Sequence, residues 1–478
     1  MNKKILKTIN YAIENIPAYR DFLIKSRVKL DKISNEKEFL KLPIINKETY
    51  IQKYPLFERI PKNTMPDFVY ASSGSSGVPT FWFGSKQHES VGGDIHEQIV
   101  RDVFKIKKNE PTLVIVCFAM GVWIAGNYTV ASFRELSKKG YLISVISPSI
   151  EHKDILNVLK NLAPMFKNVI ICGYPPFLAD VINEVKKNKI SLPSKLKFLL
   201  SGDRFPETWR SDFLKACNIT EKEGEISLVN VYGSADGGPM AFETPLTVFI
   251  RKTAQKNKKL SNEFFGEGSL NPGIYQYDPD YVYFENQNNE LVITANTSSP
   301  LIRYNLHDIG AVFSYNEVMD ILKKFNLTKL AINHGLEEFN FPFVVVKGRT
   351  DVAVTFYALN IYPENIKAGI NDRRVRNSLT GNFIAQNTML PNNKGEVLEI
   401  IVEVKNHERL SYALKSKVEE AIVDNLVKTN IEYNKIHTSL GSKSIPKIKL
   451  RKTGQIKNSK FLSHALLSLV AKKPIMLT

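Results

Sequence analysis

The chain has 478 residues, of which 43% are hydrophobic, so it is long enough for roughly two or three domains with sizeable cores. It contains no uncharged apolar run as long as the roughly 18 residues of a membrane-spanning helix, which excludes that class of protein. The formal net charge of +17 favours anionic partners such as nucleotides, acidic proteins or nucleic acid.

The three cysteines are an odd and widely spaced set: Cys117, Cys172 and Cys217. Such a set argues against a disulfide framework and against a zinc site. The N-terminus has an amphipathic period and lacks the apolar core of a signal peptide. We therefore expect a reducing compartment, the cytoplasm.

Basic residues gather near the C-terminus with no acidic residue among them. The cluster consists of Lys443, Lys447, Lys449, Arg451, Lys452, Lys457 and Lys460. It can meet an anionic substrate, an acidic carrier protein or a membrane surface, or it can be a solvated face. We expect no nucleic acid here, because no aromatic residues are interleaved with the charges.

A glycine- and serine-rich loop follows an N-terminal region, residues 1–65, that is predicted to form helices and loops. Tyr70–Phe83 reads YASSGSSGVPTFWF, and the loop residues are Ser72, Ser73, Gly74, Ser75, Ser76 and Gly77. Glycines let backbone N–H groups approach an anion, and hydroxyls donate to phosphate oxygens. No Gly-Lys-Ser/Thr follows, so this is not a Walker A loop. The alternative is a hairpin turn or a linker.

Strands and helices alternate after this loop. Ser85 is expected to cap a helix that runs to Phe104. The predicted strands then span 112–118, 141–146, 168–172 and 196–200, and the predicted helices span 127–139, 153–161 and 176–188. This alternation predicts an α/β fold with a parallel sheet, whose ligands bind at the carboxyl ends of the strands.

From about Glu243 the chain changes to short strands and turns, predicted at 281–285, 291–295 and 311–313. A strand at 344–347 ends at Gly348, and a new set of elements follows: strands at 352–356, 398–404 and 447–449, and a helix at 412–429. We therefore expect a large N-terminal domain over residues 1–347 and a smaller C-terminal α+β domain over residues 348–478.

Two later segments offer carboxylates beside glycines or strand ends. Val231–Pro239 reads VYGSADGGP, and its Asp236 can hold Mg²⁺ over a triphosphate. Ser299–Gly310 reads SPLIRYNLHDIG, and we expect its Asp308 to be a loop carboxylate that accepts hydrogen bonds from ribose hydroxyls. Each segment alone is also compatible with an ordinary turn or surface loop.

The order and spacing of these segments resemble the adenylate-forming superfamily of acyl-CoA synthetases, peptide-synthetase adenylation domains and luciferases. The Gly/Ser loop resembles the SSGTTGxPx phosphate loop, YGSAD resembles YGxTE, and RYNLHD resembles RYxTGD. GRTDVAVTFYALNIYPENI resembles GRxDDxxxxxGxxVxPxEIE. Near the N-terminus, NIPAYRDF, LPIINKETY and KYPLF are similar to the phenylacetate–CoA ligase branch. The resemblance covers nearly the whole chain and implies a large domain of layered sheets and helices with a small mobile C-terminal domain.

The resemblance implies a two-step reaction. A carboxylic acid attacks the α-phosphate of ATP, giving an acyl-adenylate and pyrophosphate, and an acceptor then displaces AMP. The acceptor is CoA, the phosphopantetheine of an acyl or peptidyl carrier protein, or an amine. The implied cofactors are ATP and Mg²⁺, with CoA or a carrier for a thiol acceptor, and the branch also allows a homodimer.

The resemblance also implies residue roles. The Gly/Ser loop holds the β- and γ-phosphates, Asp236 is the magnesium ligand, Asp308 binds ribose, Arg349 reaches ribose or phosphate, and Asp351 is the hinge. The other nucleotide candidates are Ser201, Gly202, Asp203, Tyr232, Gly233, Ser234, Arg303 and His307. The acyl pocket is expected to involve an apolar set, namely Phe118, Trp123, Ile124, Gly126, Tyr128 and Gly237.

Four departures from the family pattern affect the expected chemistry. Asp236 stands where the family usually has the longer Glu, His307 replaces a glycine before the ribose Asp, and Ala358 replaces a glycine of the thiol tunnel. In RKTGQIKNSKF, Gln455 occupies the place of the lysine in RTxxGKIxR. Losing that charge is expected to cost about 2–4 kcal/mol of transition-state stabilisation.

Lys452 or Lys457 can take over the missing charge from a neighbouring position, and these residues join Gln455, Asp236 and Asp351 as catalytic candidates. The sequence thus predicts an AMP-forming ligase of the phenylacetate–CoA ligase type, acting on an apolar or aromatic acid. The alternative is a homologue that binds nucleotide or acyl-adenylate as a partner in a biosynthetic pathway without catalysing adenylation.

Overall fold

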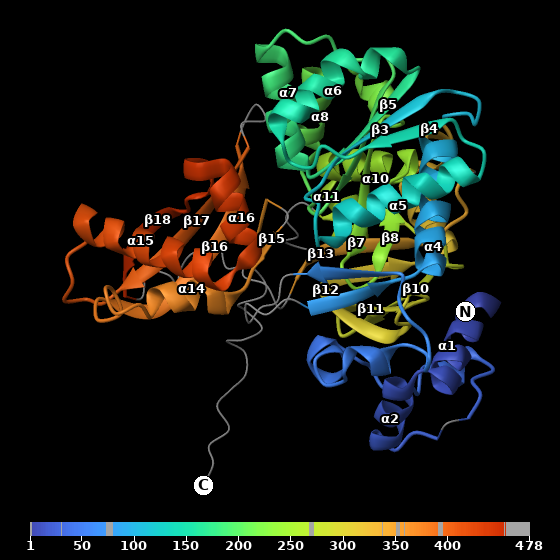
Figure 1. Ribbon diagram of the computed structural model, residues 1–478, viewed down its shortest axis with the longest axis horizontal. Helices are drawn as coiled ribbons and strands as arrows, with labels where there is room; N and C mark the ends of the chain where they lie inside the picture. The colour runs from blue at the N-terminus through green and yellow to red at the C-terminus, as the bar shows by residue number, and fades with distance from the viewer. Residues whose placement is uncertain are drawn as a thin grey trace. The chain divides into compact units, whose positions relative to one another are not determined.

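The computed structural model describes residues 2–29, 31–72, 80–266, 272–336, 338–349, 354–357, 359–390, 395–453 and 455. The chain divides into two compact units, which are described separately. The large unit comprises residues 1–72 and 81–348, and the small unit comprises residues 73–80 and 349–478. The predicted α/β class is confirmed by the layering of helices on a large mixed sheet (Figure 1).

Within the described residues, eleven strands form the main sheet of the large unit in the order β10-β11-β12-β13-β9-β8-β7-β6-β5-β3-β4. Their bounds are β3 Thr112–Cys117, β4 Ile143–Ile146, β5 Asn168–Gly173, β6 Leu196–Ser201, β7 Leu228–Ser234, β8 Gly238–Phe242, β9 Gly273–Gln276, β10 Val282–Gln287, β11 Glu290–Ala295, β12 Leu301–Phe313 and β13 Phe343–Arg349. Strands β4, β3, β5, β6 and β7 pair in parallel, as the alternating pattern predicts. Every residue of β3 and β5 is buried, because helices cover both faces of the sheet there.

The helices of the large unit follow the predicted rhythm. They are α1 Lys3–Asn15, α2 Pro17–Lys25, α3 Glu36–Phe39, α4 Lys86–Gln98, α5 Ile124–Lys138, α6 His152–Asn161, α7 Pro175–Lys187, α8 Glu207–Ala216, α9 Glu221–Gly224, α10 Pro245–Lys256, α11 Lys258–Phe265, α12 Tyr315–Lys324 and α13 Thr328–Ile332, with short turns η1 Lys47–Ile51, η2 Leu56–Arg59, η3 Ile99–Val103 and η4 Ala163–Met165. Ser85 caps α4 as predicted, its side chain accepting a hydrogen bond from the His88 N–H at 3.2 Å. Helix α5 begins at Ile124, earlier than the predicted 127, and its N-cap residue Trp123 makes no side-chain cap, so no capping residue marks this start in the sequence.

Strand β12 differs most from the prediction, which placed a loop at 299–310 and a short strand at 311–313. Instead, one strand runs from Leu301 to Phe313. Arg303 and His307 have φ values of 51° and 59°. The register of β12 against β11 shifts twice, once between Glu290 and Val292 of β11 and once between Ile293 and Ala295. These β-bulges interrupt the period-two alternation by which a strand is recognised in sequence.

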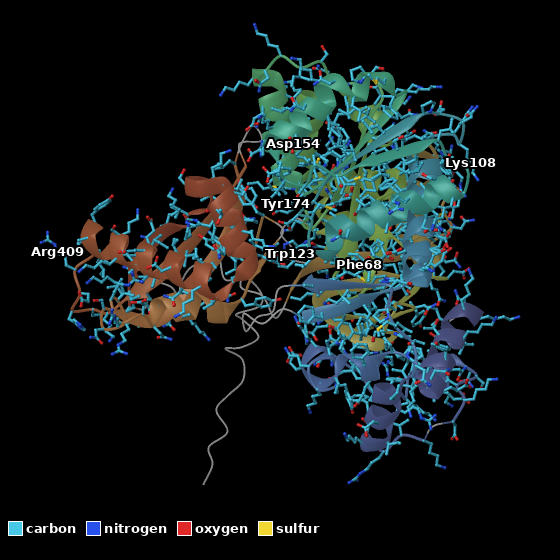
Figure 2. All side chains as sticks on the ribbon, in the orientation of Figure 1. Phe68, Lys108, Trp123, Asp154, Tyr174 and Arg409 are labelled. Atoms are coloured by element: carbon cyan, nitrogen blue, oxygen red, sulfur yellow. The ribbon has the colours of Figure 1, made fainter. Side chains whose placement is uncertain are left out.

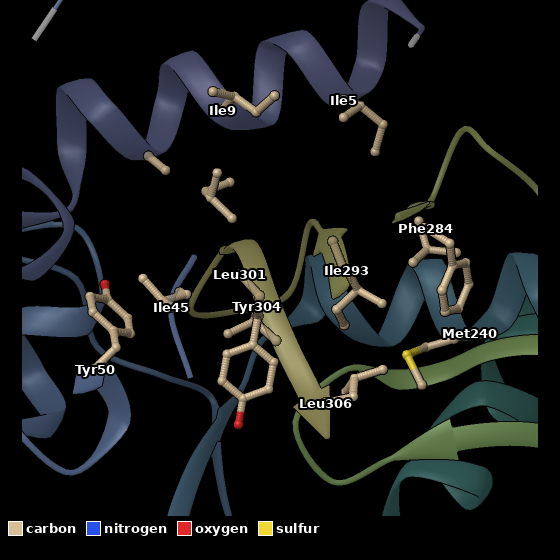
Figure 3. Packing of buried hydrophobic residues seen from close by; sticks show 14 of the residues in the cluster. Ile5, Ile9, Ile45, Tyr50, Met240, Phe284, Ile293, Leu301, Tyr304 and Leu306 are labelled. Atoms are coloured by element: carbon tan, nitrogen blue, oxygen red, sulfur yellow. The ribbon is translucent and has the colours of Figure 1, made fainter. Parts of the chain in front are cut away.

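The N-terminal helices pack against the β10–β12 end of the sheet, as the dark blue helices in Figure 1 show. In Figure 3, Ile5 and Ile9 of α1 project toward Ile293 and Leu301, and all four side chains belong to one buried cluster. Charged side chains such as Lys108 and Arg409 extend outward from the ribbon (Figure 2). No helix among the described residues combines the length and the apolar character required to cross a bilayer.

Two short strands, β1 Phe68–Ser72 and β2 Thr80–Gly84, flank the Gly/Ser loop and pair with each other. The three cysteines are buried free thiols. Cys117 lies in β3 and Cys172 in the neighbouring strand β5, and burial raises the pKa of both thiols.

The small unit contains a sheet of β16 Leu379–Met389, β17 Glu396–Val404 and β18 Lys447–Lys452, a hairpin of β14 Val354–Phe356 and β15 Leu359–Ile361, helices α14 Pro363–Ile370, α15 Tyr412–Thr429 and α16 Ile431–Leu440, and the turn η6 Gly441–Ser444. Helix α15 has the predicted bounds. Strand β16 and helices α14 and α16 have no counterpart in the prediction.

Candidate functional site

The turn between β7 and β8 carries Asp236 and is closed by its neighbours. The Ser234 hydroxyl accepts a hydrogen bond from the Gly237 N–H at 3.0 Å. A Cβ atom on Gly233 would lie 2.7 Å from the Gly238 carbonyl oxygen, and Gly238 has a φ of 69°. Glycine is therefore required at both ends of the turn that positions the Asp236 carboxylate.

Two tyrosine–aspartate contacts join this turn to β12. The Tyr232 hydroxyl donates to Asp308 at 2.5 Å, and the Tyr304 hydroxyl donates to Asp236 at 2.6 Å. In each segment the aspartate follows the tyrosine by four residues, so the two contacts cross between the segments. We call these four residues the crossed pairs. They bring together the two carboxylates that the sequence predicts for one nucleotide site.

Asp308 lies on strand β12 and not on the predicted loop. The bulge at His307 breaks the alternation immediately before it, and the His307 N–H donates to the Asn305 side chain at 2.8 Å. The His307 imidazole lies 3.6 Å from the Glu48 carboxylate and 3.7 Å from the Glu290 carboxylate. The bulky side chain predicted to enter this turn is thus directed at two acidic groups of the large unit.

The predicted adenine loop follows β6. Ser201 donates to the Val231 carbonyl at 3.0 Å, and Gly202 has a φ of 100°. Asp203 accepts hydrogen bonds from the Arg204 N–H at 2.7 Å and from the Tyr174 hydroxyl at 3.4 Å. Burial raises the pKa of Asp203 to about 6, although Arg204 opposes the shift. These contacts hold the loop beside the end of β7.

Tyr232 also belongs to a row of aromatic rings. Its ring stacks on Tyr275 at a centroid distance of 5.7 Å and on Phe284 at 6.1 Å. Tyr275 and Phe284 are buried in a core cluster, so Tyr232, which is only partly buried, is the ring of this row that can meet a planar base.

A small cavity of about 10 Å³ lies next to the Asp236 turn. Two of the predicted acyl-pocket residues, Tyr128 and Gly237, line it. His88, which the sequence analysis does not single out, lines it as well, and the buried Nδ1 of His88 has no hydrogen-bond partner in the described structure. Burial lowers the pKa of His88 to about 4, so its ring is neutral at pH 7. An isolated histidine on a helix gives no signal in a single sequence.

The other predicted pocket residues are not all brought to this cavity. Trp123 pairs with Ala71 of β1, and a Cβ atom on Gly126 would lie 2.6 Å from the Ala119 carbonyl oxygen. Ile124 packs against the core cluster that contains Tyr128, whereas Phe118 belongs to a different cluster beneath the parallel strands. Figure 2 labels Trp123 at the start of α5.

Comparison with solved structures shows that this chain is similar in fold to a known ligase that has been solved in two states. A 2-hydroxyisobutyryl-CoA ligase in complex with 2-HIB-AMP and CoA, in the thioesterification state, matches with a TM-score of 0.63 and 14% identity, over 98% of this chain and 90% of that chain. The postadenylation state of the same ligase with R3-HIB-AMP matches with a TM-score of 0.54 and 14% identity, over 96% and 87%. This chain has the adenylate-forming fold. No family model and no curated protein matches the sequence.

The side chain of Arg303 contacts protein groups that lie outside the predicted nucleotide site. Its buried guanidinium pairs with Glu285 at 2.8 Å and donates to the carbonyl oxygens of Leu40 at 2.6 Å and Leu42 at 2.5 Å. These contacts tie the segment after α3 to β12. They favour a structural role for Arg303 over the predicted contact with a nucleotide.

In the small unit, Lys452 and Gln455 lie at the end of β18. The Lys452 ammonium donates to the carbonyl oxygens of Asn406, at 3.0 Å, and Glu408. The Gln455 side-chain oxygen accepts from the Lys452 N–H at 3.1 Å. In the same basic cluster, Lys449 pairs with Glu399 at 2.6 Å. Two lysines of the predicted basic cluster, Lys449 and Lys452, therefore bind groups of the small unit itself.

Several predicted site residues lie outside the described residues: Ser73, Gly74, Ser75, Ser76, Gly77, Asp351, Ala358 and Lys457. For Ser72 and Arg349 only the backbone is described. Among the side chains that the structure describes, no group of three or more His, Cys, Asp or Glu could share a metal ion. A lone carboxylate such as Asp236 still fits Mg²⁺, because this ion is commonly held by one or two carboxylates together with substrate phosphates.

Proposed function

We propose that this protein activates a carboxylic acid with ATP to an acyl-adenylate and then transfers the acyl group to a thiol or an amine. The observation that carries the proposal is the set of crossed pairs, which fixes the carboxylates of Asp236 and Asp308 beside the same two strands. The adenylate-forming fold and the sequence resemblance support the same reaction.

Each member of the crossed pairs has a distinct task in this proposal. Asp308 accepts hydrogen bonds from the ribose hydroxyls, and the ring of Tyr232 covers one side of the adenine. Tyr304 orients Asp236, which would hold Mg²⁺ at the phosphates. When bound, the ion supplies positive charge against the phosphate oxygens.

The chemistry requires two anions to be held together. An oxygen of the acid attacks the α-phosphorus of ATP, the bond from that phosphorus to the bridging oxygen breaks, and pyrophosphate leaves with the electron pair. A thiol or amine then attacks the acyl carbon, and AMP leaves. The protein contributes by aligning the reactants and by placing the N–H and hydroxyl donors of residues 72–77 against the developing charge.

Two of the predicted acyl-pocket residues, Tyr128 and Gly237, line the small cavity together with His88. A volume of about 10 Å³ is about that of one water molecule, so any carboxylic acid that binds there requires the surrounding side chains to move. We propose an enzyme similar to the phenylacetate–CoA ligases in its order of motifs, located in the cytoplasm and taking an apolar or aromatic acid.

The test is ATP–pyrophosphate exchange across a panel of short and aromatic carboxylic acids. We expect exchange with at least one acid of the panel and a loss of about a hundredfold in Asp308→Ala, because two charge-assisted hydrogen bonds to ribose disappear. Absence of exchange with every acid, together with absence of AMP binding by calorimetry, would remove the proposal.

One observation favours a second candidate, a protein that binds acyl-adenylate without forming it. Gln455 replaces the family lysine, and the ammonium of Lys452 is bound by carbonyl oxygens of its own unit. Gln455→Lys separates the candidates. A large gain in exchange rate favours a binding protein that has lost catalysis, whereas an unchanged and already high rate favours a substitute lysine.

A further inference from the structure

Arg59, at the end of η2, is a buried cation whose hydrogen bonds are incomplete. Its side chain is among the most enclosed charged groups of the large unit, with 4% relative exposure. Nη2 lies 3.5 Å from the Phe81 carbonyl oxygen, while Nε and Nη1 are buried with no hydrogen-bond partner in the described part of the chain. Buried polar groups are normally paired, because leaving them unpaired is costly.

The surroundings of Arg59 come from three segments that the sequence assigns to one nucleotide site. Its guanidinium lies 5.9 Å from the ring centroid of Trp82, on the strand that leaves the Gly/Ser loop. Burial lowers the pKa of Arg59, while the phenols of Tyr50 and Tyr304 and the carboxylate of Asp236 oppose that shift. The negative charge of Asp236, the predicted magnesium ligand, thus acts on the guanidinium in the direction that favours its charged form.

The backbone of Arg59 is fixed as well. The Ser299 hydroxyl donates to the Arg59 carbonyl at 2.7 Å, just before β12 begins. The adjacent Ser298 hydroxyl donates to Ser85, which follows β2, at 3.0 Å. Arg59 is thus anchored between the segment that leads into β12 and the strand that follows the Gly/Ser loop.

We propose that Arg59 binds the polyphosphate group of the nucleotide, contacting β- and γ-phosphate oxygens before the reaction and pyrophosphate after it. A planar guanidinium presents parallel N–H donors that match two phosphate oxygens, so one such anion satisfies both unpaired nitrogens. This inference rests on the proposed function, because it concerns the same site.

A phosphate fits this position better than the carboxylate of the acid substrate. Arg59 lies beside the strand that leaves the predicted phosphate loop, through its contacts with the Phe81 carbonyl oxygen and the Trp82 ring. It also supplies a positive charge from the large unit in a chain whose family lysine is replaced by Gln455. A cation at the leaving group stabilises the charge that develops on pyrophosphate.

The experiment is calorimetric titration of the full-length protein with inorganic pyrophosphate, ATP and AMP. We expect Arg59→Gln to weaken pyrophosphate and ATP binding by about tenfold or more, while AMP binding stays within about twofold because AMP lacks the contacted phosphates. The matched control is Arg101→Gln, a surface arginine already paired with Asp102 at 2.6 Å, and its three affinities should equal those of the wild type.

Equal pyrophosphate affinity in the wild type and Arg59→Gln would overturn the inference, as would a wild-type protein that does not bind pyrophosphate. If Arg59→Gln does not fold, Arg59→Lys serves instead. Lysine keeps the charge but lacks the paired donors, so weakened pyrophosphate binding supports the inference and unchanged binding overturns it.

Calorimetry and the pyrophosphate exchange assay together distinguish this inference from the proposed function. Pyrophosphate binding that depends on Arg59, without exchange for any acid, supports the Arg59 contact and removes the enzyme. Exchange activity with pyrophosphate binding that does not depend on Arg59 supports the enzyme and removes the contact.

Discussion

The hydroxyl of Tyr304 donates a hydrogen bond from β12 to the Asp236 carboxylate, and the effect of this bond can be measured by removing one oxygen atom. We expect Tyr304→Phe to lower the free energy of unfolding by about 1 kcal/mol and the exchange rate by about tenfold, because Asp236 loses its orienting hydrogen bond. Urea denaturation and pyrophosphate exchange check the two effects.

Tyr19→Phe is the matched control. Tyr19 lies in the same buried cluster as Tyr304, but its hydroxyl has no hydrogen-bond partner among the described residues. Losing it should leave both stability and exchange at or above the wild-type level, because no contact is broken. A Tyr304 variant that behaves like the Tyr19 variant would contradict the role given to the crossed pairs.

Two buried histidines make stability depend on pH. Burial lowers the pKa of His88 and of His96 to about 4, below the value of about 6.5 in an unfolded chain. The unfolded state therefore binds more protons below pH 6.5, and stability that is complete above that pH is lost as the pH falls toward 4. At pH 5 the loss should reach about 2 kcal/mol for each histidine.

Chemical denaturation at pH 7.5 and pH 5 measures this dependence. The variant His96→Gln should lose less stability than the wild type over the same interval. Asp203 acts in the opposite direction, because its pKa is raised to about 6 and protonation favours the folded state. The comparison of wild type and variant cancels this contribution, and equal pH dependence in both would refute the assignment to His96.

For single residues, the sequence predicts a functional role when the residue lies in a recognisable motif, and it does not predict one for an isolated residue. Asp236 and Asp308 are predicted because glycines and strand ends surround them. Arg59 and His88 are missed because each is a lone residue in an ordinary helical context, and the groups that make them notable lie far away in the chain. Arg59 is notable through Trp82, Asp236 and Ser299.

Among the described strands, β12 is the longest with 13 residues, and its backbone has positive φ values at Arg303 and His307. Its Gly310 lies against β13, where a Cβ atom would come within 2.2 Å of the Val345 carbonyl oxygen. We expect Gly310→Ala to lower the free energy of unfolding by about 1–3 kcal/mol, because backbone must shift to admit the methyl group. Denaturant titration measures the change.

Gly348→Ala provides the control in the neighbouring strand. Apart from its two chain neighbours, no described residue has an atom within 4 Å of the position that its Cβ would occupy, so the methyl group meets no obstacle there. Alanine there should raise stability by about 0.4–1 kcal/mol by restricting the unfolded chain. A loss of stability as large as that of Gly310→Ala would show that the steric argument is wrong.

The elements that could be predicted are those with an uninterrupted pattern. The parallel strands β3 and β5 are nearly continuous apolar runs between helices, β6 is apolar except for Lys197 and Ser201, and α15 has its predicted bounds. Strand β12 could not be predicted because bulges at Arg303 and His307 shift its alternation twice. The side chains of Arg303 and Glu285 meet only after folding, so their ion pair leaves no local pattern.

For the whole molecule, the order of the motifs was sufficient to predict the adenylate-forming fold, whereas the boundary at residues 347 and 348 stays a prediction. Three clusters of buried hydrophobic residues in the described part of the chain lie entirely before residue 349. We therefore expect a chain ending at residue 348 to unfold in one cooperative transition and to bind AMP, while lacking exchange activity. Thermal unfolding and calorimetry check this, and a fragment without a cooperative transition would refute the boundary.

The three buried cysteines allow transient unfolding of the native protein to be measured by the rate of thiol modification. A thiol-reactive dye needs an accessible thiolate, and the native chain offers Cys117, Cys172 and Cys217 only in protected, protonated form. Colour should develop slowly in native buffer and quickly in denaturant. Because Cys117 and Cys172 lie in the adjacent strands β3 and β5, beside the edge strand β4, the slow reaction of these two thiols measures how often this end of the sheet opens.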